Sequence, residues 1–137
     1  MKNECTASLN NGLLVSVTLP ALLLAAVILT PTKKAWIPWS AGDCRAIISG
    51  NDTLCRSDDC RALTRGSVEL CSSPDCRALL RNNPELCSSR DCRAVIRMDE
   101  ELCQSDDCRA AITNRPERCG LYTCKAILRG KSEQCGR

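Results

Sequence analysis

A period of sixteen residues constrains this chain more than any other feature of its 137-residue sequence. From Cys44 to Cys135, six units each contain a cysteine, ten residues, a second cysteine and four residues, without a change of register. A unit of this size cannot bury a hydrophobic core alone, so neighbouring units must pack against one another. The period therefore predicts a repeat architecture in which each unit is one small supersecondary element.

The residue order inside each unit predicts two short helical segments. Four of the first cysteines follow a serine by three residues, which is the N-cap spacing, and five directly follow an aspartate that favours a helix N-terminus. About two turns later, residues such as Gly50, Gly66 and Asn82 end the helix. A second turn follows, for example at residues 84–87. We expect an all-α fold in which six helical hairpins stack as a small solenoid, shaped as a short rod with a polar C-terminal cap.

The cysteine content predicts a fold that is held by disulfides. The chain has 13 cysteines, no phenylalanine and only three other aromatic residues, so its core is thin. Because the chain is expected to turn midway between the two cysteines of a unit, we predict a disulfide inside each unit, beginning with Cys44–Cys55. Pairing across the four-residue gap would leave Cys44 and Cys135 without partners. The cysteines predicted to form disulfides are Cys44, Cys55, Cys60, Cys71, Cys76, Cys87, Cys92, Cys103, Cys108, Cys119, Cys124 and Cys135.

The N-terminal part of the chain is predicted to target a membrane. No charged residue lies between Glu4 and Lys33, and most residues from 13 to 29 are aliphatic. The length of this stretch suits both a cleaved signal peptide and an uncleaved transmembrane anchor, and both alternatives stay open. The expected organisation is a membrane-targeting segment at residues 1–34 that meets the membrane through residues 13–30, a Trp/Pro linker at 35–42 and the repeat domain at 43–137.

The location of the repeat domain follows from two opposing signals. Lys33, Lys34, Trp36 and Trp39 resemble the interfacial belt of a membrane helix, and the positive-inside rule applied to these lysines would place the repeats in the cytoplasm. Twelve regularly spaced cysteines favour an oxidising compartment instead. We give the cysteines more weight and predict an extracytoplasmic protein that is either membrane-anchored or secreted.

A basic residue follows each first cysteine and supplies the candidate binding surface. In stacked units these residues would form a row of cations able to engage an anionic polymer, such as an acidic polysaccharide, or an acidic protein face. The alternative is that each arginine pairs with a carboxylate of an adjacent unit. This row, called the Arg row below, consists of Arg45, Arg61, Arg77, Arg93, Arg109 and Lys125.

Several function classes are disfavoured by what the sequence lacks. It contains no histidine, no pair of cysteines two residues apart and no phosphate-binding glycine loop, so we predict neither an enzyme nor a cofactor. Residues 43–137 hold sixteen Lys and Arg against fifteen Asp and Glu, and this near-neutral charge argues against nucleic acid as a partner. We therefore predict a non-enzymatic binding or structural module. The alternative is a protein that binds soft metals, Zn or Cu(I), through thiolates or performs thiol redox chemistry.

Overall fold

The computed structural model describes residues 31–136, and every regular element in this range is helical. Each of the six units begins with an α-helix of about two turns and continues into a single 3-10 turn. This confirms the prediction of an all-α fold built from six disulfide-stapled helical units. The α-helices are α2 (Ala41–Ser49), α3 (Asp58–Arg65), α4 (Pro74–Arg81), α5 (Arg90–Arg97), α6 (Asp106–Thr113) and α7 (Tyr122–Arg129). The 3-10 helices are η1 (Pro31–Lys34), η2 (Asp52–Leu54), η3 (Val68–Leu70), η4 (Pro84–Leu86), η5 (Glu100–Leu102), η6 (Pro116–Arg118) and η7 (Ser132–Gln134).

The helix starts follow the predicted capping pattern. The side-chain oxygens of Ser57, Ser73, Ser89 and Ser105 each accept the backbone N–H of the cysteine three residues later, at 3.0–3.1 Å. Such a bond satisfies one of the amides that the first helical turn leaves without a partner. In α7 the cap position is held by Leu121, which makes no such bond.

Each α-helix ends at a residue in the left-handed region, where the chain turns towards the 3-10 segment. Glycine takes this place after α2, α3 and α7, and asparagine takes it after α4 and α6. The residue after α5 is Met98, with φ of 56°. For a residue other than glycine, the left-handed conformation costs about 1 kcal/mol or more. Met98 adopts it because the turn that follows each α-helix requires a left-handed residue at this position.

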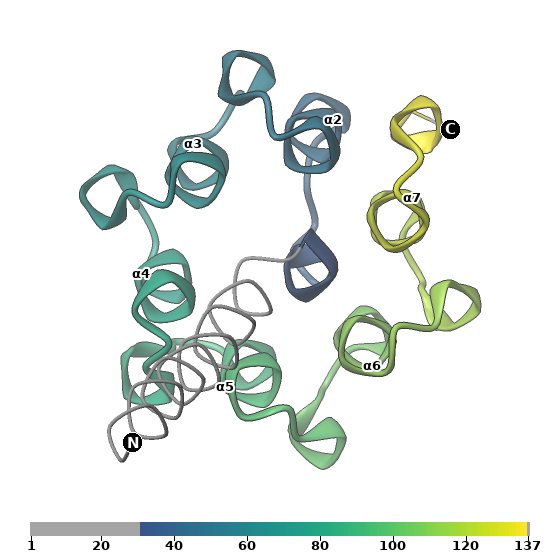
Figure 1. Cartoon of the computed structure of the whole chain (residues 1–137). Coiled ribbons are helices and arrows are strands. Elements are labelled where there is room, and N and C mark those ends of the chain that lie inside the picture. Colours follow the sequence, from purple (N-terminus) through teal and green to yellow (C-terminus); the bar gives the residue numbers. More distant parts are fainter. Residues whose placement is uncertain (1–30, 137) are drawn as a thin grey trace, which may run out of the picture.

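The six units form a closed ring (Figure 1). The α-helices line the inside of the ring, and the 3-10 turns lie on its outer rim. Helix α2 of the first unit packs against α7 of the last unit as it does against α3. The sulfur of Cys44 lies 3.9 Å from the carbonyl oxygen of Thr123, which repeats the 3.9 Å contact between Cys60 and Asp43. The repeats therefore curve until the last unit meets the first, and the prediction of a short open rod is wrong.

The disulfides join each unit to the next, so the predicted pairing inside each unit, beginning with Cys44–Cys55, is wrong. The bonds are Cys55–Cys60, Cys71–Cys76, Cys87–Cys92, Cys103–Cys108, Cys119–Cys124 and Cys44–Cys135. Their Cα–Cα distances are all 5.5–5.8 Å. From the sequence alone, pairing across the four-residue gap is disfavoured because it would leave Cys44 and Cys135 without partners. In the closed ring these two cysteines bond to each other, so that objection does not hold.

Small residues at the contacts between units allow the α-helices to lie close together. The alanines two residues after the first cysteines, Ala46, Ala62, Ala78, Ala94, Ala110 and Ala126, are fully buried. The next position, occupied by residues such as Ile47, Leu63 and Val95, is also buried. This agrees with the close approach that the repeated alanine predicts. By contrast, Leu54 and Leu86 in the 3-10 turns are exposed on the outer rim.

Residues 31–39, called the strap below, lie inside the ring. Helix η1 of the strap contacts α6 and α7, and the Nζ atom of Lys34 donates a hydrogen bond of 2.9 Å to the carbonyl oxygen of Leu63 in α3. The strap thus contacts helices on different sides of the ring, and Figure 1 shows η1 lying inside the ring. The indole N–H of Trp39 donates to the carbonyl oxygen of Lys34 at 2.8 Å, and both side chains are buried. The assignment of Lys34 and Trp39 to a membrane interface is therefore wrong, because they belong to the interior of the ring.

The proposed membrane contact, residues 13–30, lies outside the described residues. Within residues 31–136, no helix has both the length and the apolar character that crossing a membrane requires.

Loss of the Cys44–Cys135 bond should destabilise the protein more than loss of a bond between sequence neighbours. The chain-entropy estimate gives about 4–5 kcal/mol for a loop of this length and about 2 kcal/mol for a loop of a few residues. We expect Cys44→Ser/Cys135→Ser to lower the free energy of unfolding by about 2 kcal/mol more than Cys71→Ser/Cys76→Ser, measured by denaturant titration without reductant. Equal losses in the two variants would show that ring closure adds no special constraint.

Replacement of Lys34 should stabilise the protein at neutral pH. Burial lowers the pKa of Lys34 from 10.5 to about 8, which corresponds to about 3 kcal/mol of unfolding free energy, and loss of the bond to Leu63 offsets about 1 kcal/mol of this. We expect Lys34→Met to be about 1–3 kcal/mol more stable at pH 7. Its advantage should shrink between about pH 8 and pH 10.5, because the folded wild type loses its Lys34 proton first and sheds the cost of the buried charge. Denaturant titrations at several pH values measure this difference. If Lys34→Met were more stable than wild type by the same amount at every pH, the buried charge of Lys34 would not be the cause.

Candidate functional site

Five aspartates connect each unit to the start of the next one. Asp43, Asp59, Asp75, Asp91 and Asp107 each accept hydrogen bonds from the backbone N–H groups 13 and 14 residues later. The shorter bond of each pair is 2.6–2.8 Å. The sequence analysis placed these residues at helix N-termini, and the structure adds this contact across the junction. We call them the clamp aspartates.

At two junctions the clamp hydrogen bonds lower the pKa of the aspartate. Partial burial acts to raise the pKa of Asp59 and Asp75, but the hydrogen bonds from the two following serines at each junction outweigh it, and the pKa of each carboxyl lies below its usual value. A hydrogen bond to the ionised form stabilises that form. The clamps of Asp59 and Asp75 therefore hold best when these two carboxyl groups are charged.

The same clamps fix the direction of the helices. The first turn of α2 carries Asp43, and its partners Arg56 and Ser57 begin the next unit just before α3. Neighbouring helices therefore lie with their N-termini side by side. Because this contact recurs at the following junctions, the α-helices of the ring point the same way and place their C-termini on one face.

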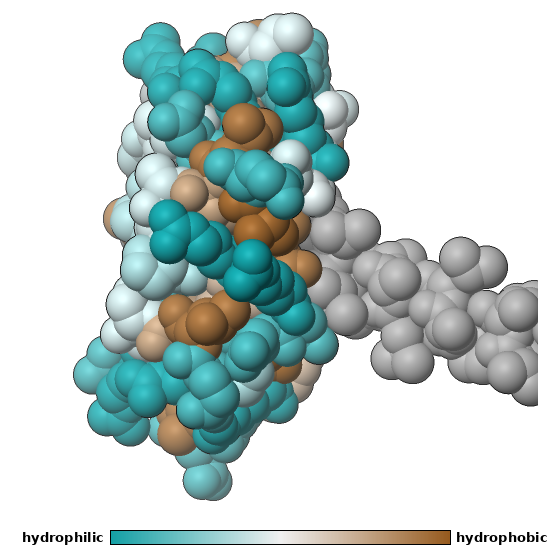
Figure 2. Space-filling model, turned by 90° about the vertical axis from the view of Figure 1, so that its left-hand side faces the viewer, coloured by the Kyte–Doolittle hydropathy of each residue, from teal (hydrophilic) through white to brown (hydrophobic). Residues whose placement is uncertain are grey.

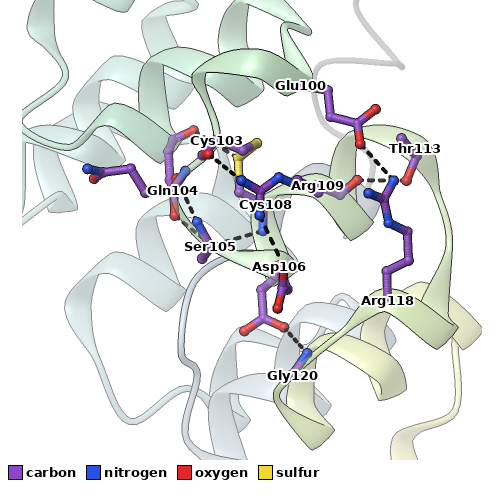
Figure 3. A network of polar contacts seen from close by, with 12 residues as sticks. Glu100, Cys103, Gln104, Ser105, Asp106, Cys108, Arg109, Thr113, Arg118 and Gly120 are labelled. Carbon is purple, nitrogen blue, oxygen red and sulfur yellow. Dashed lines mark hydrogen bonds and ion pairs between the residues drawn. A yellow bond between two sulfur atoms is a disulfide. The ribbon is translucent and has the colours of Figure 1, made fainter.

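The Arg row lies at the junctions between units, on the outer side of the helices. Arg61 and Arg109 form ion pairs with Asp58 and Asp106, three residues earlier in the same helix, at 2.7 and 3.1 Å. Both guanidinium groups also donate to the carbonyl oxygen of the second cysteine of the preceding unit. Figure 3 shows this arrangement around Arg109, beside the Cys103–Cys108 disulfide. At these two places the Arg row stabilises the junction.

Other members of the Arg row keep their charge unpaired. Arg77 donates to the carbonyl oxygens of Cys71 and Ser72, and Arg93 donates to that of Ser89. In the part of the chain that the structure describes, neither forms an ion pair, and both are exposed. Arg45 and Lys125 likewise have no carboxylate partner among residues 31–136. The Arg row is thus divided between paired and available cations.

The outer rim alternates between charged and apolar surface. Figure 2 shows hydrophobic patches separated by strongly hydrophilic bands on the side of the ring around α4. Exposed leucines of the 3-10 turns, among them Leu70 and Leu86, contribute the apolar part. The rim therefore presents cations set in an apolar background, which strengthens charged contacts compared with a fully solvated surface.

Each clamp aspartate lies close to the disulfide of its junction. Asp43, Cys55 and Cys60 place a carboxylate oxygen and two sulfurs within 4.8 Å of one another, and the next four junctions repeat this trio. Carboxylate and thiolate groups are metal ligands, but only a deprotonated, unbonded cysteine sulfur supplies a thiolate. With the sulfurs joined as in Cys55–Cys60, the trio holds two units together and its sulfurs supply no thiolate.

A cavity of about 370 Å³ opens between the strap and the C-terminal ends of α2 and α3. Its walls include Ile47, Ile48 and Leu63, with Lys34 beside them and the exposed caps Gly50 and Gly66 at the helix ends. This cavity could not be predicted from the sequence, because Lys34 follows a long apolar stretch and has the context of a membrane boundary. No local signal in the sequence indicates that this lysine enters a ring formed by residues far along the chain.

No family model, curated protein or solved structure matches this chain. The chemistry of the surfaces described above is therefore the basis for inferring a function.

Removal of a clamp charge should weaken the ring. In Asp75→Asn the carboxylate that accepts from Ser88 and Ser89 becomes a neutral amide, and hydrogen bonds to charged groups contribute about 1.5–3 kcal/mol. We expect the free energy of unfolding at pH 7 to fall by about 1–3 kcal/mol in a denaturant titration.

Asp106→Asn provides the control, because Asp106 is exposed and pairs only at the surface, where a change of about 0–1 kcal/mol is expected. The clamp contribution should disappear as the pH falls through the lowered pKa of Asp75. Wild type and Asp75→Asn should then converge in stability below about pH 4. A constant difference down to pH 2 would contradict an ionic clamp.

Proposed function

We propose that this protein is a non-enzymatic binding or structural module that works in an oxidising compartment outside the cytoplasm. One observation carries the proposal: disulfides join every pair of neighbouring units around residues 44–135, including the first and the last. Such a ring depends on oxidised cysteines at every junction, and these persist in secreted and extracytoplasmic proteins. The apolar residues 13–30 would deliver the chain to the membrane, either as an anchor or as a cleaved signal.

The available cations of the Arg row support an anionic partner. Arg77 and Arg93 occupy equivalent positions in adjacent units, and both are exposed without a carboxylate partner in residues 31–136. A flexible polyanion that follows the rim would meet one guanidinium group in each of these units. Arginine binds carboxylate and sulfate groups through paired hydrogen bonds, so an acidic polysaccharide or an acidic protein face is the expected partner.

The unpaired arginines should matter more for this binding than the paired ones. We expect Arg77→Gln/Arg93→Gln to weaken binding to heparin about tenfold or more at low salt. The slope of log Kd against log salt concentration should also fall by about two, since two fewer counterions are displaced. Fluorescence anisotropy with labelled heparin measures both quantities, and poly-glutamate serves as the acidic peptide probe.

Arg61→Gln/Arg109→Gln is the matched control, because it removes the same charge from arginines that are ion-paired. An equal loss of affinity in both variants would indicate attraction by bulk charge and contradict the assignment to Arg77 and Arg93. No binding of wild type to either polyanion would overturn the proposed partner class.

A soft-metal thiolate protein is the alternative, and the repeated Asp-Cys-Cys trios are the feature that favours it. In a reducing compartment the same sulfurs would be free to act as ligands. The two proposals differ in the state of the cysteines in the protein isolated from its source.

Alkylation of the native protein without reductant, followed by mass spectrometry, separates these alternatives. The proposed function predicts twelve blocked cysteines, no bound metal and a proteolytic fragment that joins Cys44 to Cys135. Alkylation of the repeat cysteines, or zinc or copper in the native mass, would establish the thiolate protein instead. The intact mass also shows whether the residues before the strap are retained.

A further inference from the structure

The interior of the ring contains a cavity that the strap does not fill. Helix η1 packs against α6 and α7, so the strap lies to one side and leaves space next to α2 and α3. The volume of about 370 Å³ lies at the lower end of the range of small-molecule sites.

The lining of this cavity combines apolar and cationic side chains. Ile48 is partly exposed, Ile47 and Leu63 are almost fully buried, and Lys34 and Arg65 supply the charged side chains. Arg65 already pairs with Asp52 of η2. Lys34 is therefore the lining cation whose charge no carboxylate balances within the described residues.

The ammonium group of Lys34 is buried with little compensation. The residue is only 8 % exposed, and its one described hydrogen bond goes to the carbonyl oxygen of Leu63 near the C-terminus of α3. A helix C-terminus carries about half a negative charge, so it balances about half of the ammonium charge. Two further N–H donors of the ammonium group remain for another acceptor.

The charged groups on the surrounding helices are engaged elsewhere. Asp43 and Asp59 clamp the next unit on the N-terminal side of α2 and α3, and Asp107 does the same on α6. Asp58 and Asp106 pair with arginines of their own helices. On α7, Lys125 and Arg129 line a separate hollow with Tyr122, and η1 adds the cation Lys33. None of these groups supplies an anion to Lys34.

We propose that the ring cavity binds a single monocarboxylate with a small apolar body, such as a medium-length alkyl chain, its carboxylate bonded to Lys34 and its chain packed against Ile48 and the exposed edges of Ile47 and Leu63. The carboxylate completes the neutralisation of a buried charge, and the hydrocarbon leaves water. The cost of burying Lys34 in the free protein is then recovered when the ligand binds. This site is independent of the Arg row, which lies on the outer rim.

Calorimetric titration of the full, oxidised chain with decanoate tests the proposal. We expect saturation at one decanoate per chain at pH 7. Because burial holds the pKa of Lys34 near 8 and a bound carboxylate favours the protonated amine, binding at pH 8.5 should take up a fraction of a proton. Titrations in buffers of different ionisation enthalpy measure this uptake. Above pH 8 the affinity should fall, by up to about tenfold for each pH unit.

Lys34→Met keeps the length and volume of the side chain without its charge. It should bind decanoate at least tenfold more weakly and abolish the proton uptake, with its fold checked by circular dichroism. Lys33→Met removes an equal charge from the neighbouring residue and should retain both properties. Decanol, which has the chain without the charge, and acetate, which has the charge without the chain, should each bind at least tenfold more weakly than decanoate.

The opposite outcomes would overturn the proposal. Equal binding of decanol and decanoate, or undiminished binding to Lys34→Met, would identify an apolar cavity in which the lysine plays no part. Binding without proton uptake at pH 8.5 would place the carboxylate away from Lys34. No binding to the full chain would show that the cavity is closed or filled by residues of the chain itself. Failure of heparin to bind bears only on the Arg row and leaves this site unaffected.

Discussion

The bond between Cys44 and Cys135 converts a row of repeats into a closed ring, and the other features of the fold depend on this closure. An open solenoid exposes the packing surfaces of its first and last units and needs polar caps to cover them. Here α7 covers α2 with the same contacts that the other neighbours make. Closure therefore allows units with alanine-rich contacts and almost no aromatic residues to bury a continuous core.

The clamps hold the helix dipoles parallel around the closed ring, and the charges of the repeat follow from this arrangement. All N-termini lie on one face, where the clamp aspartates meet partial positive charge, and all C-termini lie on the other, where arginines such as Arg65, Arg81 and Arg97 end the helices. Many charged residues that suggest a binding surface in the sequence thus stabilise the helices and the contacts between units. Among the residues considered as binding groups, those without a carboxylate partner in the described part of the chain are Arg45, Arg77, Arg93 and Lys125 of the Arg row, and Lys34 inside the ring.

The repeat period, the serine caps and the buried alanines could be predicted from sequence because each depends on residues within one unit. The disulfide pairing could not, because five bonds depend on how the chain crosses from one unit to the next, and the Cys44–Cys135 bond depends on how strongly successive units curve. In an open rod this cysteine spacing would leave Cys44 and Cys135 unpaired. In a ring the same spacing lets these two cysteines pair with each other. Lys34 was assigned to a membrane boundary for a similar reason: its partner Leu63 comes from a distant unit. Sequence reasoning found the Arg row but not which of its members are free.

The strap gives the molecule an unusual topology. Residues 34–40 run from the level of the helix C-termini, where Lys34 meets Leu63, to the N-cap of α2 at Ser40 on the opposite face. The covalent loop closed by Cys44 and Cys135 thus encircles a part of its own chain, as in a lasso. If that bond formed before the strap entered, the product would have the same mass and the same disulfides but a different topology. Converting one form into the other by way of this bond would require reducing it, so the order of oxidation and threading decides which molecule is made.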